Sequence, residues 1–210
     1  MKEILSSAFE QLIDALEDME QKYEIKYYLV GGILANVYSV FRITQDIDFV
    51  ADIQTAKISI SYYIDILKNY DFKPLQDWRE TEILAKETGI LQYFDANNRV
   101  KFDNYVIDRA KQTKYKKLGA MGLKRRKREK ILGIECWIYS KEDFILSKLV
   151  FGGWQDFSDA LGCWLRFQDD LDIEYLQSKS QDLNVEKELD LLMSGVEDPD
   201  EYFEKLNGRL

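Results

Sequence analysis

Two aspartates stand two residues apart in an otherwise apolar run, Asp46 and Asp48 in DIDFV. On a strand, residues two apart project from the same face, with Cα atoms roughly 7 Å apart. Adjacent carboxylates repel each other unless a cation lies nearby, and hard divalent ions such as Mg²⁺ or Mn²⁺ bind several carboxylate oxygens. The pair is therefore one candidate for a metal site. The alternative is a strand start at which Asp46 caps the preceding turn and Asp48 reaches solvent, and for an isolated D-x-D motif this alternative is favoured.

Gly31 and Gly32 give the aspartates a context, because they follow an apolar strand and open a helix. Backbone N–H groups at a helix start attract phosphate, and glycine allows close approach of a ligand. Gly-Gly is equally compatible with a plain tight turn. The segment between Gly32 and Asp46 has room for one helix and one turn, which predicts that the carboxylates return beside the glycines.

A third carboxylate follows in RVKFDNYV, where strand alternation places Lys101, Asp103 and Tyr105 on one face. Asp103 is a candidate metal ligand or a general base for an attacking hydroxyl. The alternative is a half-exposed hairpin in which Lys101 pairs with Asp103. Further along, Lys148 falls inside the apolar arc of a predicted helix. Such a lysine either extends its stem towards solvent or faces an interior anion such as a triphosphate.

The composition limits the chemistry that is available to this chain. It contains 2 cysteines and no histidine, which leaves no disulfide framework, zinc site or histidine general base. Carboxylates, lysines, hydroxyls and a hard metal remain. With 46% hydrophobic residues, the chain has enough apolar material for a substantial core.

The net charge of −9 is unevenly distributed. Residues 168–210 contain 13 Asp and Glu against 4 Lys and Arg, whereas residues 101–130 contain 12 Lys and Arg against 3 Asp and Glu. The basic run KYKKLGAMGLKRRKREK fits a solvated loop and edge strand, since lysine and arginine protect exposed edges. The other interpretation is a surface for phosphate or RNA.

No membrane association is expected. The longest charge-free apolar stretch, 27–41, has 15 residues, which is too short to span a bilayer. The first 21 residues place apolar side chains at helical spacing among acidic ones, unlike a signal peptide. We therefore expect a cytoplasmic protein.

Hydrophobic periodicity predicts alternating helices and strands up to residue 139 and helices alone afterwards. This pattern gives an α/β core at 1–139 and a helical C-terminal part at 140–210 packed on the core. Strands are predicted at 27–30 and 46–53, in a hairpin around Asn97-Asn98, and again in REKILGIECWIYS. Helices are predicted at 4–22, 31–41, 56–69, 109–118, 154–167, 172–180, 185–193 and 200–206, with a helix or loop at 79–87 and a helix capped by Ser140 in SKEDFILSKLVF.

The order of strand, Gly-Gly, helix, D-x-D strand and later aspartate resembles the polymerase-beta-like nucleotidyltransferase superfamily. More narrowly, LVGGILANVYSVFRITQDIDFV resembles the AbiEii-type bacterial nucleotidyltransferases, in which R-x-T/S-x-D-x-D follows the glycines. KFD at 101–103 is similar to their K-x-D element, and residues 140–165 are similar to their lysine-bearing helix and the acidic helix start that follows. One departure is Gln155, which stands before Asp156 where that family usually has a basic residue.

This resemblance implies a mixed sheet of the nucleotidyltransferase fold flanked by helices, and transfer of a nucleoside monophosphate from an NTP. Asp46, Asp48 and Asp103 would be the catalytic and metal-binding residues for Mg²⁺ or Mn²⁺. The nucleotide-binding residues would be Gly31, Gly32, Arg42, Thr44, Lys101 and Lys148. Asp156 and Asp159 are weaker candidates, because an N-cap with an acidic third position explains them without catalysis.

The implied acceptor is a hydroxyl of RNA, tRNA in particular, or of a protein, with the basic segment 111–130 as the RNA-binding surface. The resemblance also implies the toxin of a toxin–antitoxin or phage-defence pair, with an antitoxin-like protein partner. Two alternatives remain open. One is a catalytically silent nucleotide-binding or regulatory module of the same fold, and the other is a module whose acidic C-terminal helices bind a basic protein.

Overall fold

The computed structural model describes residues 2–107 and 114–208, which form two compact units. Within the described residues, the first unit comprises 2–33, 43–107 and 126–138, and the second comprises 34–42, 114–125 and 139–208. The predicted division into 1–139 and 140–210 stays a prediction. The second unit also draws on two segments from earlier in the chain.

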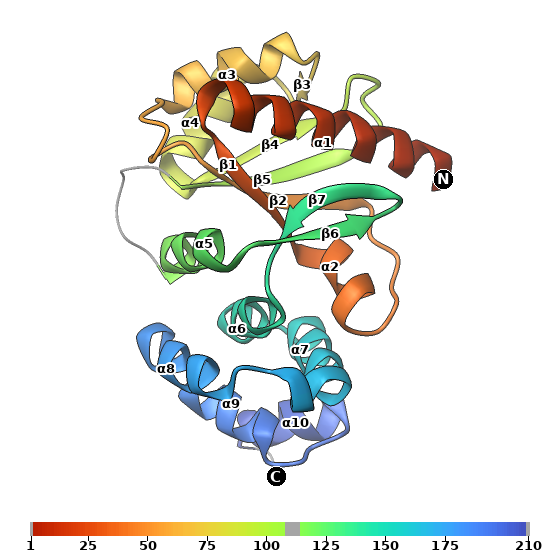
Figure 1. The fold of residues 1–210 in the computed structure, drawn as a ribbon, viewed down its shortest axis with the longest axis vertical. Helices are drawn as coiled ribbons and strands as arrows, with labels where there is room; N and C mark the ends of the chain where they lie inside the picture. Colours follow the sequence, from red (N-terminus) through yellow and green to blue (C-terminus); the bar gives the residue numbers. More distant parts are fainter. Residues whose placement is uncertain (1, 108–113, 209–210) are drawn as a thin grey trace. The chain divides into compact units, whose positions relative to one another are not determined.

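Seven strands in the described part of the first unit form one mixed sheet in the order β3-β4-β5-β2-β1-β7-β6 (Figure 1). β2 pairs antiparallel with β1 and parallel with β5. β1 also pairs parallel with β7. The strands are β1 (Lys26–Val30), β2 (Asp46–Asp52), β3 (Lys73–Pro74), β4 (Ile90–Phe94), β5 (Lys101–Ile107), β6 (Lys127–Ile131) and β7 (Ile134–Ile138).

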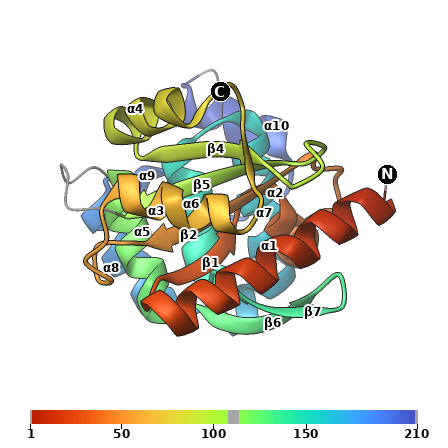
Figure 2. The same ribbon diagram turned by 90° about the horizontal axis from the view of Figure 1, so that it is seen from above.

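Helices α1 (Lys2–Tyr23) and α3 (Ile60–Asn69) lie over one face of this sheet, with α4 (Trp78–Thr88) beside α3 (Figures 1 and 2). The core beneath them is aromatic. The ring of Tyr93 lies 6.5 Å from Phe49 and 5.7 Å from Phe102, between ring centroids. Asn104 is fully buried on the same face and donates to the Tyr63 hydroxyl of α3 at 2.7 Å. The residues of β2 and β5 that alternate with Phe49, Phe102 and Asn104 therefore face the other side of the sheet.

The second unit is helical. It contains the end of α2 (Gly31–Tyr38) and α5 (Lys114–Arg125), α6 (Lys141–Phe151), α7 (Trp154–Phe167), α8 (Ile173–Leu183), α9 (Glu186–Met193) and α10 (Pro199–Leu206). Ser140 caps α6 as predicted, because its hydroxyl accepts from the Asp143 N–H at 3.1 Å. Phe157 of α7 packs against Tyr202 of α10 with ring centroids 5.1 Å apart.

The predicted fold class, a mixed sheet flanked by helices with a helical C-terminal part, is confirmed. The β4–β5 hairpin is confirmed as well. The helix predicted at 31–41 ends at Tyr38, and the side chain of Asn36 accepts from the Arg42 N–H at 2.7 Å beyond that end. The helix predicted from residue 56 begins at Ile60, because Ser59 accepts from Tyr62 as its N-cap.

The basic run begins as a helix, which confirms the part of the helix predicted at 109–118 that the structure describes, and differs from the alternative of a solvated loop. Lys114–Arg125 is the helix α5, and an edge strand, β6, follows as expected. The first part of the helix predicted at 109–118 lies outside the described residues. None of the helices in the described part of the chain combines the length and apolar character needed to cross a membrane.

Arg126 directly precedes β6 and connects the β6–β7 hairpin to α1 and β1. Its guanidinium makes a two-pronged ion pair with Glu20, at 2.5 and 3.0 Å, and donates to the Tyr27 carbonyl at 2.8 Å. It also stacks 4.1 Å from the Trp137 ring. A planar guanidinium is needed for this combination, which a lysine ammonium cannot reproduce.

We therefore expect Arg126→Lys to lower the free energy of unfolding by about 2 kcal/mol, measured by urea denaturation. The control Lys130→Arg changes an exposed position of the same edge strand and should stay within about 0.5 kcal/mol of the wild type. Equal stability of the two variants would contradict this role for Arg126.

Candidate functional site

The parallel pairing of β2 with β5 brings the strand candidates together. Asp46 lies opposite Lys101, and Asp48 lies opposite Asp103. All four side chains are partly exposed, whereas the alternate residues of both strands are buried. The three carboxylates predicted as metal ligands therefore share one face of the sheet in the first unit, opposite the face covered by α1 and α3.

Lys101 supplies positive charge to this face. Its Nζ lies 2.9 Å from Oδ2 of Asp103 and 3.6 Å from Oδ2 of Asp46. Burial tends to lower the pKa of Lys101, but its pKa is raised, because the ion pairs with Asp103 and Asp46 outweigh that effect. The pairing between Lys101 and Asp103 is the one named as the alternative on sequence grounds.

Gln92 is a residue of this cluster that sequence reasoning missed. β4 pairs with β5 so that Gln92 lies opposite Asp103, and its Nε2 donates to Oδ1 of Asp103 at 2.9 Å. Both oxygens of Asp103 thus accept a hydrogen bond, one from a neutral amide and one from an ammonium. The signal was present in ILQYF, where Gln92 is the one polar residue of a predicted strand.

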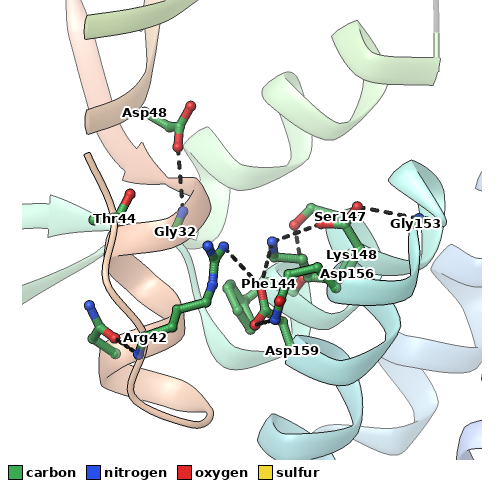
Figure 3. A network of polar contacts seen from close by, with 12 residues as sticks. Gly32, Arg42, Thr44, Asp48, Phe144, Ser147, Lys148, Gly153, Asp156 and Asp159 are labelled. Carbon is green, nitrogen blue, oxygen red and sulfur yellow. Dashed lines mark hydrogen bonds and ion pairs between the residues drawn. The ribbon is translucent and has the colours of Figure 1, made fainter. Parts of the chain in front are cut away.

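Asp48 lies against the start of α2 (Figure 3). Its Oδ2 accepts from the Gly32 N–H at 3.4 Å. Gly31 has a φ of +67°, and a Cβ there would come within 2.0 Å of the same oxygen. Position 31 therefore requires glycine for two reasons: the backbone is left-handed, and a side chain would collide with Asp48. In this structure the predicted phosphate-binding glycines are in contact with a carboxylate of the chain.

Thr44 contacts Asp46. Its hydroxyl lies 3.0 Å from the Asp46 carbonyl oxygen and 3.1 Å from Oδ1 of the same residue. The Asp46 side chain is 38% exposed, more than that of Asp103 at 13%. A ligand from solvent therefore reaches the Asp46 carboxylate more easily than the Asp103 carboxylate.

The three carboxylates are not arranged as ligands of one metal ion. No group of three or more Asp, Glu, Cys or His side chains within 2–107 and 114–208 is placed so that it could hold a metal ion. The chemistry of the donors is suitable, because all are carboxylates. Their orientation is set instead by Lys101, Gln92 and the start of α2.

The second unit holds the other candidates in one charged cluster (Figure 3). Lys148 is buried, and its Nζ lies 2.9 Å from Oδ1 of Asp156 and 2.8 Å from Oδ2 of Asp159. Arg42 reaches the same Asp159 oxygen at 3.2 Å. The two expectations for Lys148 were solvent or an interior anion, and the structure supplies an anion from the chain itself.

The carboxylates of this cluster have further partners. Asp156 is the third residue of α7 and accepts from the Gly153 N–H at 3.3 Å, as the capping interpretation expects. Gln155 donates to Oδ1 of Asp159 at 3.2 Å. Nε of Arg42 is buried and has no hydrogen-bond partner among the described residues. Arg42 therefore retains one unused donor in a buried place.

Three arginines of the basic segment are already paired with carboxylates of their own unit. Arg125 lies 3.2 Å from Glu142 and 3.4 Å from Asp172. Arg126 pairs with Glu20, and Arg128 pairs with Glu17. The local excess of positive charge in the sequence is thus partly compensated in the fold. Lys117, Lys124 and Lys130 are exposed.

Known proteins resemble this chain in structure rather than in sequence. No protein-family model matches the chain, and no curated protein matches it. A solved structure described as an antigenic nucleotidyltransferase-like protein from Paracoccidioides brasiliensis is similar with a TM-score of 0.48. The two chains are 18% identical, and the match covers 82% of this chain and 88% of the other.

Gly31→Ala tests the contact between the glycines and Asp48. We expect it to cost about 2–4 kcal/mol of stability in urea denaturation, from the left-handed backbone and the clash together. Gly133→Ala is the matched control, because Gly133 also has a positive φ but nothing within 4 Å of the added Cβ. It should cost only about 1 kcal/mol.

The clash is isolated by a double-mutant cycle with Asp48→Gly, which removes the carboxylate and its Cβ. Gly31→Ala should cost less in that background, by about 1 kcal/mol or more. Equal losses in both backgrounds would mean that Asp48 does not constrain position 31.

Lys148→Met tests the buried cluster of the second unit. It leaves Asp156 and Asp159 without their ammonium partner, and we expect a loss of about 3–5 kcal/mol in urea denaturation. Lys179→Met removes a lysine from an i,i+3 surface pair with Asp182 in the same unit and should cost no more than about 0.5 kcal/mol. Similar losses for both variants would contradict the central place of Lys148.

Proposed function

We propose that the chain is a metal-dependent nucleotidyltransferase that transfers a nucleoside monophosphate from an NTP to a hydroxyl of RNA or protein. One observation carries this proposal. The parallel β2–β5 register aligns Asp48 with Asp103 and Asp46 with Lys101, beside the glycines that open α2. The sequence resemblance to polymerase-beta-like nucleotidyltransferases, and to the AbiEii type in particular, rests on these same residues and supports the same activity.

The chemistry of the residues present suits a divalent cation. The donors are three carboxylates on one face, and the Lys101 ammonium already acts as a stand-in cation between two of them. We assign Asp46, Asp48 and Asp103 as the residues that would hold Mg²⁺ or Mn²⁺. When bound, the ion would stabilise negative charge on the attacking and leaving oxygens at the α-phosphate.

The remaining roles belong to side chains and backbone groups of the chain. Asp103 accepts the proton of the acceptor hydroxyl, and its orientation is held by the Gln92 amide. The N–H groups of Gly31 and Gly32 and the Thr44 hydroxyl bind phosphate oxygens, which requires Asp48 to turn away from the glycines.

On the motif resemblance we assign Arg42 and Lys148 to the triphosphate. The buried Nε of Arg42, which lacks a partner among the described residues, supports this assignment. Asp156 and Asp159 position the two cations, because both carboxylates pair with Lys148 and Asp159 also pairs with Arg42. They need not take part in the chemistry.

For the acceptor we favour RNA, with tRNA as the first example to test. The exposed lysines of the segment 111–130 that the structure describes, Lys117, Lys124 and Lys130, support contact with a phosphate backbone. A cytoplasmic toxin that is controlled by an antitoxin-like protein is the biological role that we propose, on the AbiEii-type resemblance of the motifs.

A second candidate is a nucleotide-binding module without turnover. It is favoured by a specific observation, namely that Lys101, Gln92 and the Gly32 N–H already occupy oxygens of Asp103 and Asp48. Such a module would bind an NTP and melt at a higher temperature in its presence, by mass action, yet transfer nothing.

The activity is tested by incubating the protein with each α-labelled NTP, Mg²⁺ or Mn²⁺, and total RNA or lysate. We expect label in RNA, with transfer reduced by roughly 100-fold or more in Asp46→Asn and Asp48→Asn, because each removes a charged metal ligand. Asp65→Asn, at an exposed surface pair with Lys68, is the matched control and should transfer label normally.

Label transferred equally by Asp48→Asn and the wild type would refute the assigned site. If no condition gives transfer but an NTP raises the melting temperature, the second candidate is correct.

A further inference from the structure

Lys101 occupies the place in the carboxylate cluster where a cation is most needed. Its Nζ lies 2.9 Å from Asp103 and 3.6 Å from Asp46, so one ammonium serves two carboxylates on neighbouring strands. Without it, Asp46, Asp48 and Asp103 would bring three negative charges onto one face. Such a group is unfavourable unless a cation compensates it.

We propose that Lys101 is an exchangeable internal counter-ion, which holds Asp46 and Asp103 in the metal-free protein and is displaced when a divalent ion binds. This inference rests on the proposed function and describes how its metal site is controlled. No covalent step is involved, and the ammonium keeps its proton and charge.

The distances make the two cations mutually exclusive. Mg²⁺ binds oxygens at roughly 2.0–2.1 Å, much closer than an ammonium nitrogen does. If Asp46 and Asp103 held one such ion, its short contacts would leave no room for the Lys101 ammonium, which contacts both carboxylates in this structure. In the present arrangement, no group of three or more Asp, Glu, Cys or His side chains in the described part of the chain is placed to hold a metal ion, so binding requires these carboxylates to move.

Lys101 is able to leave. Its side chain is 31% exposed, on a flexible four-carbon stem whose ammonium is strongly hydrated. Gln92, in contrast, stays in place when a metal ion binds. Its neutral amide donates to Oδ1 of Asp103 and does not compete with a cation. Asp103 thus keeps one fixed hydrogen bond while its other oxygen changes partner.

The direct test is Mn²⁺ affinity, from the free Mn²⁺ signal in electron paramagnetic resonance at constant pH and ionic strength. Lys101→Met, which removes the competing ammonium, should bind Mn²⁺ at least about tenfold more tightly than the wild type. Lys86→Met is the matched control, because Lys86 is exposed and pairs with Glu82 on α4. It should bind Mn²⁺ as the wild type does.

Melting temperatures give an independent measure. Metal-free Lys101→Met should melt below the wild type, since its carboxylates have lost their counter-ion. Saturating Mn²⁺ should raise its melting temperature by more than that of the wild type, because tighter binding stabilises the folded state further.

A third measurement uses the wild-type chain and so does not depend on the folding of a variant. The rate of Lys101 acetylation by a small reagent is followed by mass spectrometry, with Lys86 as the internal reference. Saturating Mn²⁺ should increase the Lys101 rate several-fold and leave the Lys86 rate unchanged, because displacement exposes the Lys101 amine.

Equal or weaker Mn²⁺ binding by Lys101→Met, or an unchanged Lys101 acetylation rate in saturating Mn²⁺, would overturn the inference while leaving the proposed activity intact. Absence of Mn²⁺ binding by the wild type and Lys101→Met alike would overturn both the inference and the metal dependence of the proposed function.

Discussion

The parallel pairing of β2 with β5 is the constraint on which the candidate site depends. In this register Asp48 lies opposite Asp103, and Asp46 lies opposite Lys101. Like charges opposite each other oppose strand pairing, and opposite charges favour it. The ion pairs made by Lys101 therefore allow two acidic strands to lie side by side, and the same pairing collects the acidic side chains at one place.

The same two strands also build the core, which fixes the register. Phe49 and Phe102 alternate with the acidic positions and pack with Tyr93 under α1 and α3. A slip of one residue would bury carboxylates among these rings and expose the rings to water. The free energy that holds the acidic face in place is thus supplied largely by the opposite face, where burial is complete. Substitutions on the acidic face can change its chemistry without removing this support.

The sequence predicted those parts of the structure that local pattern determines. Strand alternation gave the face shared by Asp46 and Asp48, and the hairpin of β4 with β5 followed from its turn. Local pattern did not predict the Gln92–Asp103 hydrogen bond, which depends on hairpin register. Nor did it predict the pairing of Arg126 with Glu20, which are 106 residues apart in the sequence. Charge counted along a chain cannot reveal which charges are compensated, because their partners come from distant elements.

Lys101 and Lys148, the two lysines that the sequence offers as candidates, differ in how deeply their side chains are buried. The side chain of Lys148 is 7% exposed and pairs with Asp156 and with Asp159, whose carboxylate also holds Arg42. Withdrawing it would leave the buried Asp159 and the partly exposed Asp156 without their ammonium partner, and the loss at a buried carboxylate costs several kcal/mol. Lys101 is 31% exposed, and its weaker contact with Asp46 is 3.6 Å long. Water can replace that contact at little cost, because exposed ion pairs contribute about 1 kcal/mol or less. A lysine within reach of solvent can exchange with another cation, whereas one enclosed by its partners serves to hold a structure together.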